Sequence, residues 1–196
     1  MLSAIAYIAV ALLRFPVVLF LSYEPKDVII AIGGFLFGPV SAFVISAVVS
    51  LIEMVTVSET GPIGLLMNVL STIAFVCPAA FLYHRRRSLS SAVVGLILGG
   101  VSMTVVMLLW NYLITPLYMN VPRDVVVTML PTVFLPFNVV KAIMNGALTM
   151  VIYKPVSNAL RRARLVPAPV AESLTVKKSK AGVTILAVVV LATALL

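Results

Sequence analysis

Charged side chains are scarce in this sequence of 196 residues. Asp, Glu, Lys and Arg together make up 10% of it and 62% is hydrophobic, whereas about 25% charged and about 45–50% apolar are usual in soluble domains. The mean hydropathy of +1.20 is correspondingly high. These values exclude an ordinary water-soluble domain, so we expect an integral membrane protein.

The side chains that build most catalytic and metal sites are also nearly absent. Cys77 is the single cysteine and His84 the single histidine, so neither an intrachain disulfide nor a cluster of cysteine and histidine ligands is expected. No Gly-x-x-x-x-Gly-Lys-Ser/Thr motif for nucleotide phosphates occurs, so we do not expect the chain to hydrolyse ATP. We predict no catalytic residues, no metal and no cofactor, and a protein that is not an enzyme.

Six apolar segments, separated by proline, glycine and charged residues, predict the fold. They cover residues 2–20, 26–37, 40–57, 63–83, 92–115 and 129–153. A helix needs roughly 20 apolar residues to span a bilayer, so most of these segments are long enough. We predict an all-α integral membrane protein, a bundle of six transmembrane helices. The second segment is short, and we expect it to tilt or to lie partly inside the bundle.

Three regions of the chain are expected. Residues 1–164 form the membrane domain that carries the binding site, and residues 165–182 form a polar cytoplasmic linker. Residues 183–196 are a hydrophobic tail that spans only about 21 Å as a helix, less than the hydrocarbon core of roughly 30 Å. We assign no role to this tail.

The net charge of +8 is best explained by membrane topology. Ten of the fourteen basic residues lie in two blocks, residues 84–87 and 154–180, between or after apolar segments. Cytoplasmic loops keep positive charge, so both blocks are expected on the cytoplasmic side, which places the N-terminus there as well. We predict a multi-pass membrane protein that binds no nucleic acid. Arg14, Lys26 and Arg123, with Glu24 and Asp27, are then expected in the outer loops.

Polar side chains in the predicted helices are expected to gather at one depth. Such side chains are costly in a membrane and mark functional sites or interhelical hydrogen bonds. Helical spacing places Asn138, Lys141 and Asn145 on one face, and Ser46, Ser50 and Glu53 on another. The expected outer layer consists of Glu53, Asn68, Asn111, Thr115 and Asn138, with Lys141 near mid-depth. Apolar side chains expected beside it are Met67, Met103, Met107, Phe134 and Phe137. This pattern predicts an outward-facing pocket for a ligand that is partly flat and apolar and partly hydrogen-bonding.

Simpler roles exist for the same residues. Asn68 and Asn145 are also explained as interhelical hydrogen-bonding groups without a ligand. Glu53 and Lys141 are also explained as a buried ion pair with each other. Gly95-x-x-x-Gly99 and Gly34-x-x-x-Gly38 predict close approach of helix backbones.

Several stretches of the sequence resemble a known family of membrane proteins. They are Phe20–Asp27 (FLSYEPKD), Gly33–Pro39 (GGFLFGP), Ser50–Met54 (SLIEM), Thr60–Gly64 (TGPIG), Trp110–Pro116 (WNYLITP) and Leu135–Lys141 (LPFNVVK). In this order they are similar to the riboflavin-specific S components of energy-coupling factor (ECF) transporters, the RibU family. The resemblance runs from about residue 4 to about residue 164.

The resemblance implies a six-helix S component that holds riboflavin near the extracellular side, under the loop between helices 1 and 2. It implies ligand contacts from that loop, which contains Tyr23, and from Asn111, Asn138 and Lys141 in the matching motifs. Lys141 would then donate a hydrogen bond to an uncharged vitamin. Riboflavin is the transported ligand here and not a cofactor.

The resemblance also implies partners. Family members work with a membrane-embedded coupling (T) subunit and two ATP-binding subunits. The coupling subunit usually docks on an Ala-x-x-x-Ala surface of the first helix, but no two alanines of residues 2–13 are four apart. Ala4 and Ala11 share a helix face and are the docking residues we expect instead.

Other functions remain possible on the sequence alone. The cargo could be flavin mononucleotide (FMN) or another vitamin, because Arg14, Lys26 and Arg123 are available in the predicted outer loops to meet a phosphate. A membrane-embedded enzyme or a scaffold without cargo is an alternative of a different class.

Overall fold

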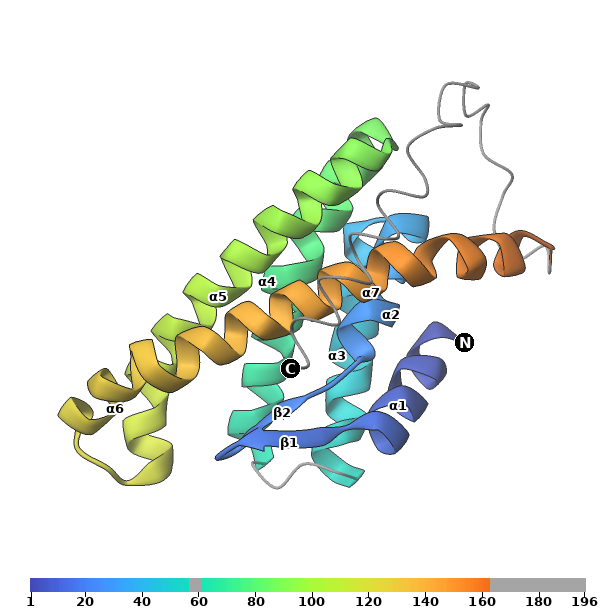
Figure 1. Ribbon diagram of the computed structural model, residues 1–196. Coiled ribbons are helices and arrows are strands. Elements are labelled where there is room, and N and C mark those ends of the chain that lie inside the picture. The colour runs from blue at the N-terminus through green and yellow to red at the C-terminus, as the bar shows by residue number, and fades with distance from the viewer. Residues whose placement is uncertain (57–60, 163–196) are drawn as a thin grey trace.

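The computed structural model of the chain describes residues 1–56 and 61–162. The predicted linker at 165–182 and tail at 183–196 lie outside these residues. Along the chain the elements are α1 (Leu2–Leu13), β1 (Phe15–Val18), β2 (Leu21–Tyr23), α2 (Lys26–Phe37), α3 (Pro39–Thr56), α4 (Gly61–Arg86), α5 (Leu89–Met119), α6 (Arg123–Met129), the π-helix η1 (Leu130–Phe134) and α7 (Leu135–Arg162) (Figure 1).

The described helices form six rods, which confirms the predicted bundle. Elements α6, η1 and α7 follow one another without a break and count as one rod, and α1 to α5 supply the others. Four rods are long and apolar enough to cross a membrane: α3, α4, α5 and the α6–η1–α7 rod. Helices α1 and α2 have 12 residues each, which is about 18 Å of helix.

The first apolar segment is not one helix, which corrects the prediction for residues 2–20. Helix α1 ends at Leu13, and β1 and β2 then form an antiparallel hairpin in which Phe15 pairs with Tyr23. The hairpin and the turn between α5 and α6 lie at one end of the molecule (Figure 1), which we call the hairpin end. The α4–α5 turn lies at the opposite end, and the run Arg85–Arg87 is there. We call it the arginine end.

Helix α2 lies inside the bundle, as its short length led us to expect. Nine of its twelve residues are buried, among them Lys26 and Asp27 in its first turn. The expectation that Lys26 and Asp27 lie in an outer loop was therefore wrong, because both belong to α2. Glu24 does lie in the connection before α2, and all three residues are at most 4% exposed. Helix α2 ends before Gly38, whose φ of +95° favours glycine, and α3 begins at Pro39.

Close backbone contact joins α4 and α5, as the Gly95-x-x-x-Gly99 pattern predicted. A methyl group on Gly95 would lie 3.0 Å from the carbonyl oxygen of Ala79, and one on Gly99 would collide with the carbonyl oxygen of Phe75. Gly34 on α2 is similarly close to Ala80 of α4. Gly95 and Gly99 let α4 and α5 pack backbone to backbone, and Gly34 leaves room for the Ala80 side chain between α2 and α4.

A winding stripe of exposed apolar side chains runs along most of α5. The exposed side chains recur every four residues and are those of Ile97, Val101, Val105, Leu109, Leu113 and Leu117. Such a stripe would be an aggregation hazard in water, but it is the surface that a bilayer covers. The arrangement fits a bundle that has lipid as its outer solvent.

Candidate functional site

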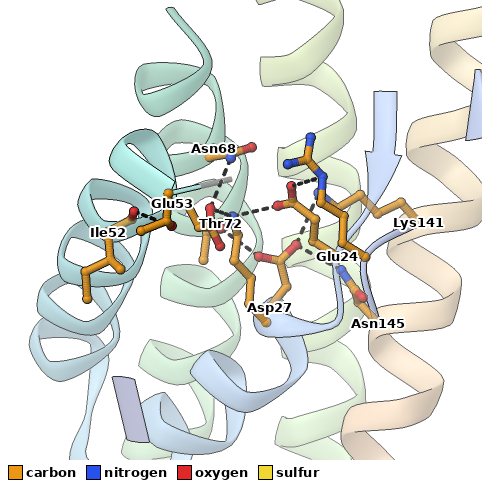
Figure 2. A network of polar contacts seen from close by, with 11 residues as sticks. Glu24, Asp27, Ile52, Glu53, Asn68, Thr72, Lys141 and Asn145 are labelled. Atoms are coloured by element: carbon orange, nitrogen blue, oxygen red, sulfur yellow. Dashed lines mark hydrogen bonds and ion pairs between the residues drawn. The ribbon is translucent and has the colours of Figure 1, made fainter. Parts of the chain in front are cut away.

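A network of six charged side chains lies inside the bundle near the hairpin end. It contains equal numbers of cations and carboxylates and is here called the charge network: Arg14, Glu24, Lys26, Asp27, Glu53 and Lys141. Figure 2 shows the carboxylates of Glu24 and Asp27 between Lys141 on one side and Glu53 on the other. Buried charges are stable only when they are paired and hydrogen-bonded, so the whole network constrains how these elements pack.

Lys26 is the most deeply buried cation of the network. Its side chain is 1% exposed, and its Nζ atom lies 2.6 Å from Glu24 Oε2 and also pairs with Glu53 on α3. Asn68 on α4 donates a hydrogen bond of 3.2 Å to the same Glu53 carboxylate. A positive charge at a helix N-terminus is disfavoured by the helix dipole, so these carboxylates also offset that cost.

The Asp27 carboxylate accepts hydrogen bonds from side chains of α4 and α7. Thr72 donates a hydrogen bond of 2.6 Å to Asp27 Oδ1, and Asn145 donates one of 3.1 Å to Oδ2. Lys141 Nζ lies 3.3 Å from the same Oδ2. Tyr23 in the hairpin donates to Asn145 Oδ1 at 2.9 Å, so the hairpin is joined to α7 through this amide. Burial raises the pKa of Tyr23 above its usual range, which keeps its hydroxyl a donor.

Glu24 lies between the hairpin and α2, outside the membrane-spanning helices. It forms ion pairs with Arg14 at 3.5 Å and with Lys26. Burial by itself raises the pKa of Glu24, but the nearby cations, Lys26 first, lower it by more. Its pKa therefore lies below the ordinary value of 4.5, and Glu24 is ionised at neutral pH.

The tip of the hairpin is fixed by aromatic packing. Phe20 makes an edge-to-face contact with Tyr118 of α5 at 5.4 Å between ring centroids and lies 6.2 Å from Phe134 of η1. Its neighbour Leu19 has a positive φ of 53°, which costs a non-glycine residue roughly 1–2 kcal/mol. Leu21 packs against Val126 and Phe134, so apolar contacts offset the strain and hold the hairpin against the α5–α6 end.

Two adjacent cavities lie under this hairpin and share Phe20 and Met67. The smaller, about 240 Å³ with its open mouth, is mainly apolar and is lined by Phe20, Ile63, Gly64, Met67, Trp110, Ile114, Thr115 and Tyr118. The larger, about 470 Å³ with its mouth, is polar and is lined by Arg14, Phe20, Leu21, Ser22, Glu24, Met67, Asn68, Ser71, Met107, Phe137, Asn138 and Lys141. The first cavity presents apolar and aromatic side chains, and the second presents hydrogen-bonding and charged groups. Small-molecule sites commonly combine apolar walls with a few polar groups.

Five of the side chains expected to bind a ligand line these cavities. Asn68, Phe137, Asn138 and Lys141 line the larger cavity, and Thr115 lines the smaller. The Nδ2 atom of Asn138 donates to the Phe134 carbonyl at 2.7 Å. This bond spans the junction of η1 and α7, and it fixes the side chain at the cavity wall.

The other three expected residues, Glu53, Tyr23 and Asn111, do not line these two cavities but are linked to the lining residues by hydrogen bonds. Glu53 accepts from Asn68, and Tyr23 reaches Lys141 indirectly through Asn145 and Asp27. Asn111 donates to the Met107 carbonyl at 2.7 Å and accepts from Thr115 at 2.9 Å. Their contact with a ligand stays a prediction.

The alternative in which Glu53 and Lys141 pair with each other is wrong. Glu53 pairs with Lys26, and Lys141 pairs with Asp27. Asn145 does join separate elements by hydrogen bonds, which agrees with its alternative role as an interhelical hydrogen-bonding group.

Four residues of the site were missed from the sequence, namely Ser22, Glu24, Ser71 and Asp27. Arg14 and Lys26 were expected only as outer-loop cations available to a phosphate, and not as members of a buried network. A signal was present, because a lone Glu53 in an apolar helix needs a cation and Lys26 directly precedes a short apolar helix. Only the burial of α2 brings the two together.

Comparison with known proteins agrees with this geometry. Residues 1–153 match the family model described as ECF transporter, substrate-specific component. The chain belongs to this family. It is therefore a multi-pass membrane protein of a transport family and not an enzyme.

Two curated relatives and one solved structure are similar to this S component. The riboflavin transporter RibU of Staphylococcus aureus (strain TCH60) is 29% identical over 172 residues, which cover 83% of this chain and 89% of the relative. The riboflavin transporter FmnP of Bacillus subtilis (strain 168) is 30% identical over 155 residues, which cover 73% and 81% respectively. A solved S component of a bacterial ECF transporter has a TM-score of 0.68 and 30% identity, with 83% of this chain and 94% of that chain covered.

Proposed function

We propose that this S component captures riboflavin on the outer side of the bacterial cell membrane and delivers it inward. The observation that carries the proposal is the pair of cavities under the hairpin, one apolar and aromatic and the other polar. Riboflavin has the same two parts, a flat ring system and a ribityl chain with hydroxyl groups. Both similar curated proteins are described as riboflavin transporters, which supports this cargo.

The side chains proposed to contact the vitamin are those of the cavity walls. Trp110 and Phe20 offer surfaces for the ring, while Asn68, Asn138 and Lys141 offer hydrogen bonds. Lys141 already has Asp27 as its counter-charge, so it can donate to an uncharged ligand without requiring an anion.

Energy for inward transport has to come from partners. The sequence contains no nucleotide-phosphate motif, and membership of the ECF family supports a membrane-embedded coupling subunit and two ATP-binding subunits as those partners. We assign the coupling subunit to the outward face of α1. Ala4 and Ala11 are exposed on it, with Ile5 and Ile8 between them. Small and apolar residues permit close helix contact within a membrane.

Titration of the purified protein with riboflavin tests the proposed cargo. Flavin fluorescence is expected to be quenched on binding, with a dissociation constant in the nanomolar range, about −12 kcal/mol. Lys141→Ala and Asn138→Ala should each weaken binding by about 1–3 kcal/mol, because each removes a buried hydrogen-bonding partner.

Lys154→Ala is the matched control, since Lys154 is an exposed cation of α7 away from both cavities. It should bind riboflavin as the wild type does. A wild-type protein that neither carries nor quenches flavin would refute the proposed cargo, and unchanged affinity in both alanine variants would refute the proposed contacts.

A further inference from the structure

Each of the cations that line the polar cavity is paired with a carboxylate. Two cations line it: Arg14 lies 3.5 Å from Glu24, and Lys141 lies 3.3 Å from Asp27. The third cation of the charge network, Lys26, lies behind the lining between Glu24 and Glu53. Three cations and three carboxylates give the network a net charge of 3 − 3 = 0.

Among the residues that the structure describes, Glu24 is the one carboxylate that lines the polar cavity. Its side chain is 5% exposed, and one oxygen faces Arg14 while the other faces Lys26. It is thus a fixed negative charge in the wall that a polar part of the ligand would meet. The cations around it keep it ionised at neutral pH, as its lowered pKa indicates.

We propose that Glu24 is a specificity residue that makes this cavity select an uncharged flavin over its phosphate monoester. The inference rests on the proposed function and adds which flavin the site accepts. The apolar cavity takes the ring system, so the ribityl chain, whose end carries the phosphate in FMN, enters the polar cavity with Glu24 in its wall.

The physical reason is the cost of an unmatched charge. A phosphate monoester carries about −1.5 to −2 charges at pH 7. In a cavity of net zero charge it finds no unpaired cation and lies near the Glu24 carboxylate, whose repulsion is weakly screened under the hairpin. A phosphate-binding site would instead present arginine or lysine side chains without carboxylates beside them. A neutral ribityl chain loses nothing by this arrangement, because the carboxylate accepts hydrogen bonds from hydroxyl groups.

Parallel titrations with riboflavin and FMN test the proposal on the purified full-length chain. The quantity of interest is the ratio of the FMN dissociation constant to the riboflavin dissociation constant. In the wild type this ratio is expected to exceed about 10, since placing like charges together costs more than the 1.4 kcal/mol that one factor of ten represents. Glu24→Gln gives the network a net charge of 3 − 2 = +1 and should lower the ratio about tenfold or more.

Asp124→Asn is the matched control. Asp124 is an exposed carboxylate in the first turn of α6, and its replacement changes the charge of the protein by the same amount without altering the cavity wall. The ratio should stay at the wild-type value. A shift as large as that of Glu24→Gln would show a general charge effect and overturn the assignment to Glu24.

A second variant keeps the test decisive if Glu24→Gln does not fold. Arg14→Gln leaves Glu24 paired with Lys26 and makes the network negative, so the ratio should rise above the wild-type value. A wild-type ratio near 1, or an unchanged ratio in every variant that folds, would overturn the role of Glu24 while leaving riboflavin capture intact. Absence of riboflavin binding in the wild type would instead refute the proposed function itself.

Discussion

At the residue scale, Lys26 shows how a buried charge holds several elements in one arrangement. Its ammonium group contacts carboxylates from the hairpin–α2 connection and from α3, and Asn68 of α4 binds the second of these. The pairing of a buried charge stabilises a fold little relative to apolar packing, but the loss of one partner is severe. Lys26 therefore acts mainly to specify which elements meet at the hairpin end.

Replacement of Lys26 by methionine, which has a similar length and no charge, tests this role. Lys26→Met leaves Glu24 and Glu53 buried without their common cation and should destabilise the protein by about 3–5 kcal/mol. Thermal unfolding in detergent, followed by circular dichroism, measures the change. Lys154→Met, at an exposed position of α7, should have little effect.

The double variant Lys26→Met/Glu53→Gln separates charge from packing. It removes the Glu53 carboxylate, whose ion pair with Lys26 is lost in Lys26→Met, whereas Glu24 keeps its ion pair with Arg14. Part of the lost stability should therefore return. If Lys26→Met unfolds at the wild-type temperature, the charge network does not constrain the fold as described.

At the scale of elements, the close pairing of α4 and α5 sets the distance between two walls of the apolar cavity. Met67 lies on α4, and Trp110, Ile114 and Thr115 lie on α5. Gly95 and Gly99, the glycines of α5 that touch the α4 backbone, lie about three to six helical turns before these α5 side chains, toward the arginine end. Any side chain added at the contact therefore acts on the cavity by separating the helices.

A methyl group at Gly99 should destabilise the protein by about 1–3 kcal/mol, the usual cost of overpacking. The cause is its collision with the carbonyl oxygen of Phe75 in α4, which is backbone and has little freedom to move. Gly99→Ala and Gly146→Ala should be compared by thermal unfolding and riboflavin titration. At Gly146 the nearest atom is the Cβ of Leu96 at 4.0 Å, so this control should be tolerated. Equal stability of the two variants would contradict the tight α4–α5 contact.

At the scale of the whole molecule, charge is distributed unequally between the two ends. The arginine end has Arg85, Arg86 and Arg87 on its exposed α4–α5 connection, while three of the cations near the hairpin end are balanced inside the charge network. Membrane orientation follows the excess of Lys and Arg in the short loops. The run of three arginines therefore supports the expectation that the arginine end and the N-terminus are cytoplasmic.

Labelling of single cysteines in intact cells tests this orientation. In a Cys77→Ser background, Asn120→Cys at the α5–α6 turn should react with a membrane-impermeant maleimide, because Asn120 is exposed at the hairpin end. Ser88→Cys, exposed at the α4–α5 turn, should react only after the cells are opened. The reverse labelling pattern would show that the protein has the opposite orientation, with the cavities on the cytoplasmic side.

The sequence predicted the helices well and the charges near α2 poorly. Long apolar segments such as 92–115 appear as helices because hydropathy and helix formation are local properties. The spacing of Asn138 and Lys141 placed them correctly on one buried face of α7. Glu24, Lys26 and Asp27 were expected in an outer loop, where charged residues are usually exposed. Their burial depends on partners that are distant in sequence.

The sequence by itself determined that lipid is the solvent of this protein, because the transfer free energies of its apolar segments are summed residue by residue along the chain. It also determined which helix faces are polar, through the helical period. Only the tertiary structure decided that α1 stops early, that a hairpin closes over two cavities, and that six charges neutralise one another beneath it. The electrostatic energy of an ion pair depends on the distance between its charges in space, and that distance exists only once the separate elements have packed.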